Sequence, residues 1–208
     1  MGEIISFSGG KDSTAMLLRM LELNYKIDSI VFADTGFEFP EIYDHIKNTE
    51  RVIGRKITII RTSEDWHKWF YGKITRGKRK GQQRGMPLKF FPCWWSREAK
   101  FKILEKYCKG HNRYIGIAAD EPRRIKEKPG YIYPLNEWGW TEDKCLSYIQ
   151  KKGLYCKIHL RFKRSGCWWC PKQSKESIET LKEFYPGLYA EMLKIQKEAP
   201  NMLKEVKK

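Results

Sequence analysis

The sequence lacks any apolar run of the roughly 18–20 residues that a transmembrane helix needs. Its first ten residues, MGEIISFSGG, also lack the basic segment and the long apolar segment of a signal peptide. We therefore expect a cytoplasmic protein with no membrane partner.

Acidic residues are scarce: 25 Asp and Glu face 41 Lys and Arg, which gives a net charge of +16. Such a field attracts polyanions, which include nucleotides, nucleic acids and acidic lipids, and charge alone does not choose among them. Hydrophobic residues make up 41% of the chain, which excludes wholesale disorder. A length of 208 residues suits one domain, or one domain with a small appended piece.

Short apolar runs alternate with helical patterns along the first part of the chain. Strands are predicted at residues 3–7, 29–33, 56–60 and 114–118, and helices at 11–23, after Pro40 and at 96–107. This order indicates a parallel sheet with crossover helices, because parallel strands need such connections. The sequence therefore predicts an α/β fold with a doubly wound, Rossmann-like parallel sheet.

Two domains are expected, at residues 1–150 and 151–208. The first is the α/β domain, and it carries a basic insertion at 72–92, whose residues 72–89 hold seven Lys or Arg, four glycines and no acidic residue. We expect this insertion to be a flexible basic loop. The second domain is a cysteine-rich segment with two short helices, at 174–184 and 187–198, and a helix at 141–152 with Thr141 as its N-cap precedes it.

The strongest local signal is the hexapeptide Ser8-Gly-Gly-Lys-Asp-Ser13, which follows the first strand and opens the first helix. Its glycines permit positive φ, so that backbone amides at a helix N-terminus can point at phosphate oxygens. Lys11 offers a positive charge, and Asp12 can orient the loop or hold Mg²⁺. The alternative is a plain Ser/Gly turn. The spacing of a Walker A loop is absent.

The hexapeptide resembles the PP-loop of the adenine nucleotide α-hydrolase superfamily. Three further blocks are similar to its phosphoadenosine phosphosulfate (PAPS) reductase branch: residues 32–41 with Asp34-Thr35-Gly36, residues 116–124, and residues 133–143. The resemblance covers roughly residues 3–173. The sequence departs from the pattern of this branch at position 118, where Ala replaces Arg, and at position 122, where Pro replaces Ser. We therefore expect one contact to phosphate fewer than in the branch.

The resemblance implies a site for an adenine nucleotide, ATP or PAPS with Mg²⁺. Its nucleotide-binding residues would be Ser8, Gly9, Gly10, Lys11, Asp12, Ser13, Asp34, Thr35, Gly36, Arg123 and Arg124. The residues implied for catalysis are Lys11, Asp12, Asp120 and Arg123. Either arginine can form a two-pronged contact with phosphate or sulfate, although the pair can also simply solvate a surface loop.

In a reducing compartment, closely spaced cysteines favour metal binding or catalysis over structural disulfides. Cys93, Cys156, Cys167 and Cys170 can supply four thiolates to a 4Fe–4S cluster or to a tetrahedral zinc ion, and His159 is a weaker substitute for Cys156. The resemblance favours iron–sulfur, because several relatives of that branch carry a cluster. The alternative is that all four are free, buried cysteines, which we also expect of Cys108 and Cys145.

Trp94, Trp95, Trp168 and Trp169 flank the proposed ligands. They can shield a cluster from water, fill the core, or stack on an adenine or an unpaired base.

Three functions remain open. The first is ATP-dependent adenylation followed by sulfur transfer to a nucleic-acid acceptor held by the basic loop at 73–89, with a sulfur donor protein as a further partner. The second is sulfonucleotide reduction. The resemblance implies that this reaction uses a nucleophilic cysteine in a C-terminal motif of the Glu-Cys-Gly-Leu-His type. This chain has no cysteine after Cys170. The third is a binding module without catalysis.

Overall fold

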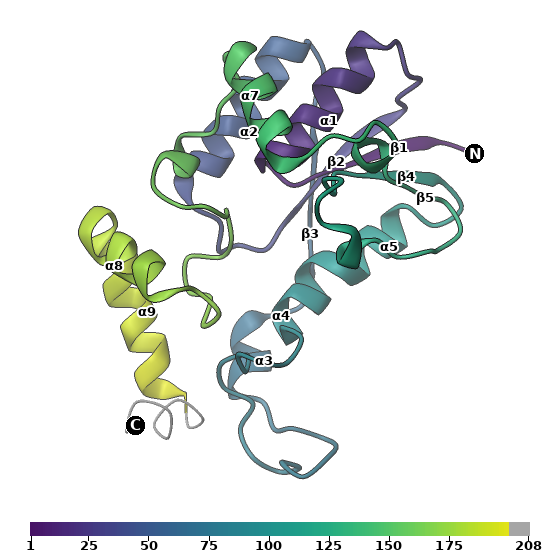
Figure 1. Cartoon of the computed structure of the whole chain (residues 1–208). Coiled ribbons are helices and arrows are strands. Elements are labelled where there is room, and N and C mark those ends of the chain that lie inside the picture. Colours follow the sequence, from purple (N-terminus) through teal and green to yellow (C-terminus); the bar gives the residue numbers. More distant parts are fainter. Residues whose placement is uncertain (200–208) are drawn as a thin grey trace.

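The centre of the fold is a five-stranded sheet in the order β3-β2-β1-β4-β5, in which every neighbouring pair is parallel. The structure is a computed structural model, and it describes residues 1–199 (Figure 1). The strands are β1 (Glu3–Phe7), β2 (Ser29–Asp34), β3 (Thr58–Arg61), β4 (Asn112–Ile115) and β5 (Tyr131–Ile132). The predicted α/β class with a parallel sheet is confirmed.

Helices cover both faces of the sheet. The helices α1 (Lys11–Glu22), α2 (Pro40–Ile53) and α7 (Glu142–Lys151) lie on one face, and α5 (Ile103–Tyr107) lies on the other (Figure 1). Successive strand residues point to opposite faces. Ile5 therefore packs in the core cluster that contains α1, whereas Ile4 packs against Leu104 of α5 in a second cluster. The sheet is doubly wound, as predicted.

The strand order reverses direction at β1, because β2 and β4 lie on its two sides. The loops that leave the carboxyl ends of β1 and β4 therefore diverge, and such a point is where open α/β sheets bind ligands. Gly116, directly after β4, lies against the start of α1: a Cβ atom placed on it would be 2.8 Å from the Cα atom of Ser13. A side chain at position 116 would thus push α1 away from the sheet.

The predicted helix at 96–107 is a continuous helical stretch of three parts: α4 (Trp94–Ser96), the π-helical segment η1 (Arg97–Lys102) and α5. The strand predicted at 114–118 starts earlier, at Asn112, and includes the buried Arg113. Pairing with β1 over Glu3–Ser6 fixes this register. Several short elements were not predicted: α3 (Trp66–Tyr71), η2 (Pro122–Arg124), β5, α6 (Pro134–Glu137) and η3 (Lys157–Leu160).

The basic insertion folds back on itself. Lys73 and Gln83 form an antiparallel bridge, and the amide of Ile74 donates to the carbonyl of Gln82 at 2.8 Å. The expected loop is thus a short, hydrogen-bonded hairpin of residues 72–85, which we call the basic hairpin.

The C-terminal part returns to the α/β layers before it ends in two helices. The short helix η3 packs against α2. The helices α8 (Lys175–Phe184) and α9 (Pro186–Glu198) then pack against each other (Figure 1). Their bounds agree to within one residue with the two helices predicted for this part of the chain. Within residues 1–199 no helix is both long and apolar enough to cross a bilayer.

A candidate nucleotide site beside a cysteine group

The loop between β1 and α1 has the form of an anion cradle. Gly9 adopts φ of +71°, and Gly10 caps α1 without a side chain. The first amides of a helix have no intrahelical carbonyl to bind, and the helix dipole places partial positive charge there. The loop therefore offers backbone donors to a phosphate group.

The Ser13 side chain shapes the loop from inside. Its Oγ lies 2.9 Å from the Oγ of Ser8 and accepts from the Ser8 amide at 3.2 Å, and it also donates to the carbonyl of Gly10 at 3.1 Å. Ser13 is buried, so its hydroxyl holds the turn instead of facing solvent.

A second support lies beneath the loop. The Thr14 hydroxyl donates to the Gly10 carbonyl at 2.9 Å, and it lies 2.9 Å from Nε2 of His45 on α2. Because the Thr14 proton is directed at Gly10, Nε2 of His45 is the donor in that pair. Burial lowers the pKa of His45 to about 4, which keeps the imidazole neutral.

Three carboxylates meet beside the cradle. One oxygen each from Asp12, Glu121 and Glu142 lie within 4.8 Å of one another. Burial raises the pKa of Asp12 to about 6, although Lys11 opposes that shift, and its Oδ1 atom is buried without a hydrogen-bond partner. The Lys11 ammonium lies 2.7 Å from Glu142. Burial opposes its charge, but the hydrogen bond to Glu142 and the field of Asp12 outweigh that and raise its pKa.

This acidic group suits a divalent cation. Mg²⁺ prefers carboxylate oxygens and binds through one or two of them together with substrate phosphates. The Oδ1 atom of Asp12 is buried and has no hydrogen-bond partner, so it is the oxygen that would bind a cation. Lys11 offsets the charge of Glu142 in part, and a cation would lower the remaining repulsion between these carboxylates and a polyphosphate on the neighbouring amides.

The loop after β4 delivers the remaining predicted residues. Asp120 accepts the Glu142 amide at 3.1 Å, so its carboxylate fixes the start of α7. Arg124 pairs with Glu121, and Arg164 of the cysteine-rich segment lies 3.2 Å from the same carboxylate. Arg123 is exposed and forms no ion pair with residues 1–199. The guanidinium groups of Arg123 and Arg164 are thus accessible from solvent.

The segment after β2 connects the cradle to the cysteines. Asp34 is buried and accepts from the Gly36 amide and the Tyr43 hydroxyl, each at 2.8 Å, and it also pairs with Arg61 at 2.7 Å. This carboxylate therefore holds its own loop together. Thr35 faces the other way: its Oγ1 lies 3.4 Å from Sγ of Cys167.

Three of the four predicted cysteine ligands are close together. Burial raises the pKa of the Cys167 thiol, and charges on Cys170 and Cys93 would raise it further. Among residues 1–199 these three sulfurs do not all lie within 4.8 Å of one another. Thiolates such as these are ligands of both zinc ions and iron–sulfur clusters.

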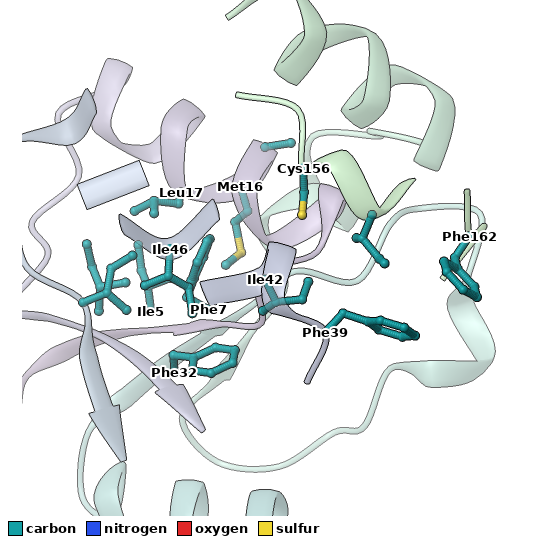
Figure 2. Close-up of a cluster of buried hydrophobic side chains, with 14 of the residues drawn as sticks. Ile5, Phe7, Met16, Leu17, Phe32, Phe39, Ile42, Ile46, Cys156 and Phe162 are labelled. Atoms are coloured by element: carbon teal, nitrogen blue, oxygen red, sulfur yellow. The ribbon is translucent and has the colours of Figure 1, made fainter. Parts of the chain in front are cut away.

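Cys156 is not part of this group. Its thiol donates to the Glu41 carbonyl at 3.5 Å, and burial raises its pKa to about 11. Figure 2 shows it among the hydrophobic side chains of α1 and α2, near Met16 and Ile42. His159, the weaker substitute, instead places Nδ1 3.4 Å from the Phe162 carbonyl, and burial lowers its pKa.

The aromatic residues around the cysteine group are largely core. Trp95, Trp168 and Trp169 are buried, and Trp94 is partly buried. Trp95 also donates its indole N–H to the Thr35 carbonyl at 2.9 Å. The two remaining cysteines, Cys108 and Cys145, are buried as expected.

Sequence reasoning missed four residues of the site: His45, Glu121, Glu142 and Arg164. Glu142 lies in the helix predicted at 141–152 and Glu121 in the motif of residues 116–124, and neither is among the residues predicted for the site. Their neighbours Asp120 and Thr141 were the available signal, since both cap the same helix end.

Comparison with known proteins agrees with this architecture. The chain is 26% identical over 202 residues to the uncharacterized protein MJ0066 and 25% identical over 209 residues to MJ0973, both of Methanocaldococcus jannaschii. These alignments cover 89% and 92% of the chain but only 39% and 47% of those relatives. An uncharacterized nin region protein of Escherichia phage lambda is 27% identical, with 86% of the chain and 68% of that protein covered.

Two solved structures resemble the chain. PAPS reductase from Candida auris superposes with a TM-score of 0.55 at 15% identity over 81% of the chain and 82% of that structure, which shows a shared fold. The U34-tRNA thiolase NcsA from Methanococcus maripaludis gives a TM-score of 0.48 at 17% identity over 93% and 70%. The phosphoadenosine phosphosulfate reductase domain family matches residues 3–173. The chain belongs to the phosphoadenosine phosphosulfate reductase domain family.

Proposed function

We propose that this protein binds Mg-ATP at the loop of residues 8–13, adenylates an acceptor at an oxygen atom, and transfers sulfur to the activated position. The acceptor would be a nucleic acid. The proposal joins the phosphate cradle, the acidic group and the cysteine group into one site.

The observation that carries the choice of nucleotide is the meeting of Asp12, Glu121 and Glu142 within 4.8 Å beside the cradle. Lys11, Arg124 and Arg164 already neutralise part of this charge, and a cation between the carboxylates and a triphosphate would neutralise more of it. Asp12, Glu121 and Glu142 would hold Mg²⁺, which would neutralise charge on the phosphates. This composition favours a metal–nucleotide complex with a pyrophosphate leaving group over PAPS.

In the adenylation step, an acceptor oxygen attacks the α-phosphorus of ATP, and the bond to the β-phosphate oxygen breaks. The loop amides and Lys11 would stabilise the departing pyrophosphate, and Arg123 can reach the phosphates from the β4 loop. Lys11 pairs with Glu142 in the absence of nucleotide, so its ammonium is already positioned near the phosphates. Catalysis here consists of positioning and charge stabilisation.

For the sulfur step, Cys93, Cys167 and Cys170 would hold a 4Fe–4S cluster. Three thiolates leave one of four irons without a protein ligand. Held by these three cysteines, such a cluster would supply sulfide received from a sulfur donor. The sulfur would replace the adenylated oxygen of the acceptor, and AMP would be the leaving group. Thr35, in the loop after β2, contacts Cys167 and would position it.

Two reactions distinguish the candidates. Pyrophosphate release from Mg-ATP that single-stranded RNA or DNA stimulates supports the proposal, whereas sulfite release from PAPS supports reduction. The raised pKa values of Cys167 and Cys170 make their metal-free thiols poor nucleophiles for that reduction. Salt-sensitive nucleic-acid binding without either product indicates a binding module.

Variants locate the activity. Lys11→Ala and Asp12→Asn should each abolish pyrophosphate release with the fold intact. Lys26→Ala, on an exposed lysine paired with Asp28, is the matched control and should keep full activity. Full turnover in both loop variants would contradict the assigned site.

A further inference from the structure

Phe90 and Phe91 are two adjacent aromatic residues that are both exposed, and Phe90 is the most exposed aromatic residue in the part of the chain that the structure describes. Phe90 is 89% exposed and Phe91 is 62% exposed, whereas the neighbouring Trp95 is 4% exposed. Exposing two large apolar rings side by side forgoes the favourable burial that such rings usually gain. A pair of this kind indicates a surface that binds something.

The backbone around these rings is held in place. The Phe91 amide donates to the Leu88 carbonyl at 3.2 Å, and the Phe91 carbonyl accepts from Lys172 at 2.6 Å. Lys172 follows Cys170 by two residues, so this bond ties the aromatic turn to the cysteine group. Cys93 itself is two residues beyond Phe91.

The basic hairpin lies directly before the two rings. Five cationic side chains of the hairpin and of the residues just after it are exposed, and none forms an ion pair with a residue in the part of the chain that the structure describes: Lys73, Arg76, Lys78, Lys80 and Lys89. Residues 72–89 contain no acidic side chain. The surface beside Phe90 therefore selects for a polyanion.

Charge also argues against a second copy of the chain as the occupant. A symmetric dimer through this turn would bring two basic hairpins together, and like charges in such a position repel. A single-stranded nucleic acid supplies both missing partners, since its phosphates match the cations and its unpaired bases match the rings. A duplex cannot, because its base faces are already stacked.

Arg84 fixes where the hairpin meets the cysteine group. Its guanidinium lies 4.6 Å from the ring centre of Trp69 and 6.0 Å from that of Trp94, the residue after Cys93. The two indoles are stacked at 6.1 Å. Arg84 and the two indoles thus connect the basic hairpin to the segment that contains Cys93.

We propose that Phe90 and Phe91 form a stacking platform for unpaired bases of a single-stranded nucleic acid, whose phosphates lie along the basic hairpin. This inference rests on the proposed function in that it specifies the acceptor as single-stranded and presents a base next to Cys93. Base–aromatic stacking accounts for roughly a 5- to 150-fold change in affinity per base.

The test measures binding of a fluorescent 12-nucleotide RNA and of the matching duplex by anisotropy, without any nucleotide, at several salt concentrations. The double variant Phe90→Ala/Phe91→Ala should weaken single-strand binding by about tenfold or more and leave the salt slope unchanged. Lys78→Ala/Lys80→Ala should instead flatten the slope, by about 0.7 for each phosphate that the variant no longer neutralises. The duplex should bind more weakly than the single strand.

Two further variants separate stacking from apolar contact. Phe90→Tyr keeps a ring and should keep affinity, whereas Phe90→Leu keeps apolar surface and should lose it. Unchanged RNA affinity in the double alanine variant would overturn the platform, as would full affinity in Phe90→Leu. The platform would also be overturned if the wild type sediments as a dimer and the double alanine variant as a monomer, because the rings would then form a subunit interface.

This outcome is independent of the adenylation assay. If pyrophosphate release from ATP is absent while ring-dependent RNA binding persists, the proposed reaction fails and the platform stands. If the reaction occurs but the alanine variants bind RNA normally, the platform fails and the reaction stands.

Discussion

The hydroxyl of Thr35 lies 3.4 Å from the sulfur of Cys167, across 132 positions of sequence. Thr35 follows β2 at the carboxyl edge of the sheet, where the phosphate loop also lies, and Cys167 belongs to the C-terminal segment. This contact joins the loop after β2 to the segment that contains Cys167. A ligand that moves the loop after β2 would therefore also move Cys167.

The cysteine arrangement predicts which residues retain iron. Cys93→Ser, Cys167→Ser and Cys170→Ser should each lose most of the iron of anaerobically purified protein, together with absorbance of order 400 nm. Cys156→Ser should retain both, because its thiol contacts the Glu41 carbonyl away from the group. Loss of iron in Cys156→Ser with retention in Cys93→Ser would show that the ligand set is different.

Gly116 predicts a steric test of the cradle. Gly116→Ala places a Cβ atom 2.8 Å from the Ser13 Cα, so α1 must shift. We expect a loss of about 1–3 kcal/mol in unfolding free energy and a clear loss of Mg-ATP binding. Gly166→Ala, which meets no atom within 4 Å, is the control and should change neither. Equal unfolding free energies and equal Mg-ATP binding in the two variants would refute the close packing of Gly116 against α1.

The indole of Trp95 predicts a difference between two adjacent tryptophans. Trp95→Phe removes the donor of the Thr35 carbonyl, whereas Trp94→Phe removes an indole N–H that has no partner among residues 1–199. Both changes remove the same atoms. Trp95→Phe should therefore cost about 1–3 kcal/mol more in denaturant unfolding. Equal costs would mean that this hydrogen bond does not hold the β2 loop.

His45 predicts how stability depends on pH. Its pKa falls from 6.5 to about 4 on folding, so the unfolded chain binds the extra proton between those values. The contribution of His45 to the free energy of unfolding is therefore fully present above about pH 6.5. It is lost as the pH falls toward 4, and the total loss is roughly 3 kcal/mol.

The comparison uses unfolding free energies at pH 7.5 and 4.5. The advantage of the wild type over His45→Gln should shrink by roughly 2–3 kcal/mol at the lower pH. His67→Gln, on an exposed ring beside Asp65, is the matched substitution elsewhere on the chain. An advantage of His45 that is the same at both pH values would contradict a buried, neutral imidazole.

The sequence predicts the first βαβ unit well because its signals are local. The run Glu3–Phe7, the glycines after it and the periodic helix from Lys11 all agree with the structure. β4 was placed about two residues late, since a buried Arg113 does not look like a strand residue. The two-residue β5 gives no periodic pattern at all.

The site was harder to predict because it depends on contacts between distant segments. Asp12 was found from its motif, but Glu142 lies 130 positions away and joins it only when α7 packs along α1. Cys156 was grouped with the other cysteines by count and spacing. A spacing of eleven residues does not reveal that its side chain turns into the core against α2.

The most direct test is calorimetric titration of the protein with ATP, once with Mg²⁺ and once with EDTA, alongside PAPS. If Asp12, Glu121 and Glu142 share a cation with the nucleotide, ATP should bind with Mg²⁺ and at least tenfold more weakly without it. Asp12→Asn should remove that difference. Binding of PAPS with no binding of ATP, or ATP affinity that ignores the cation, would contradict the central claim.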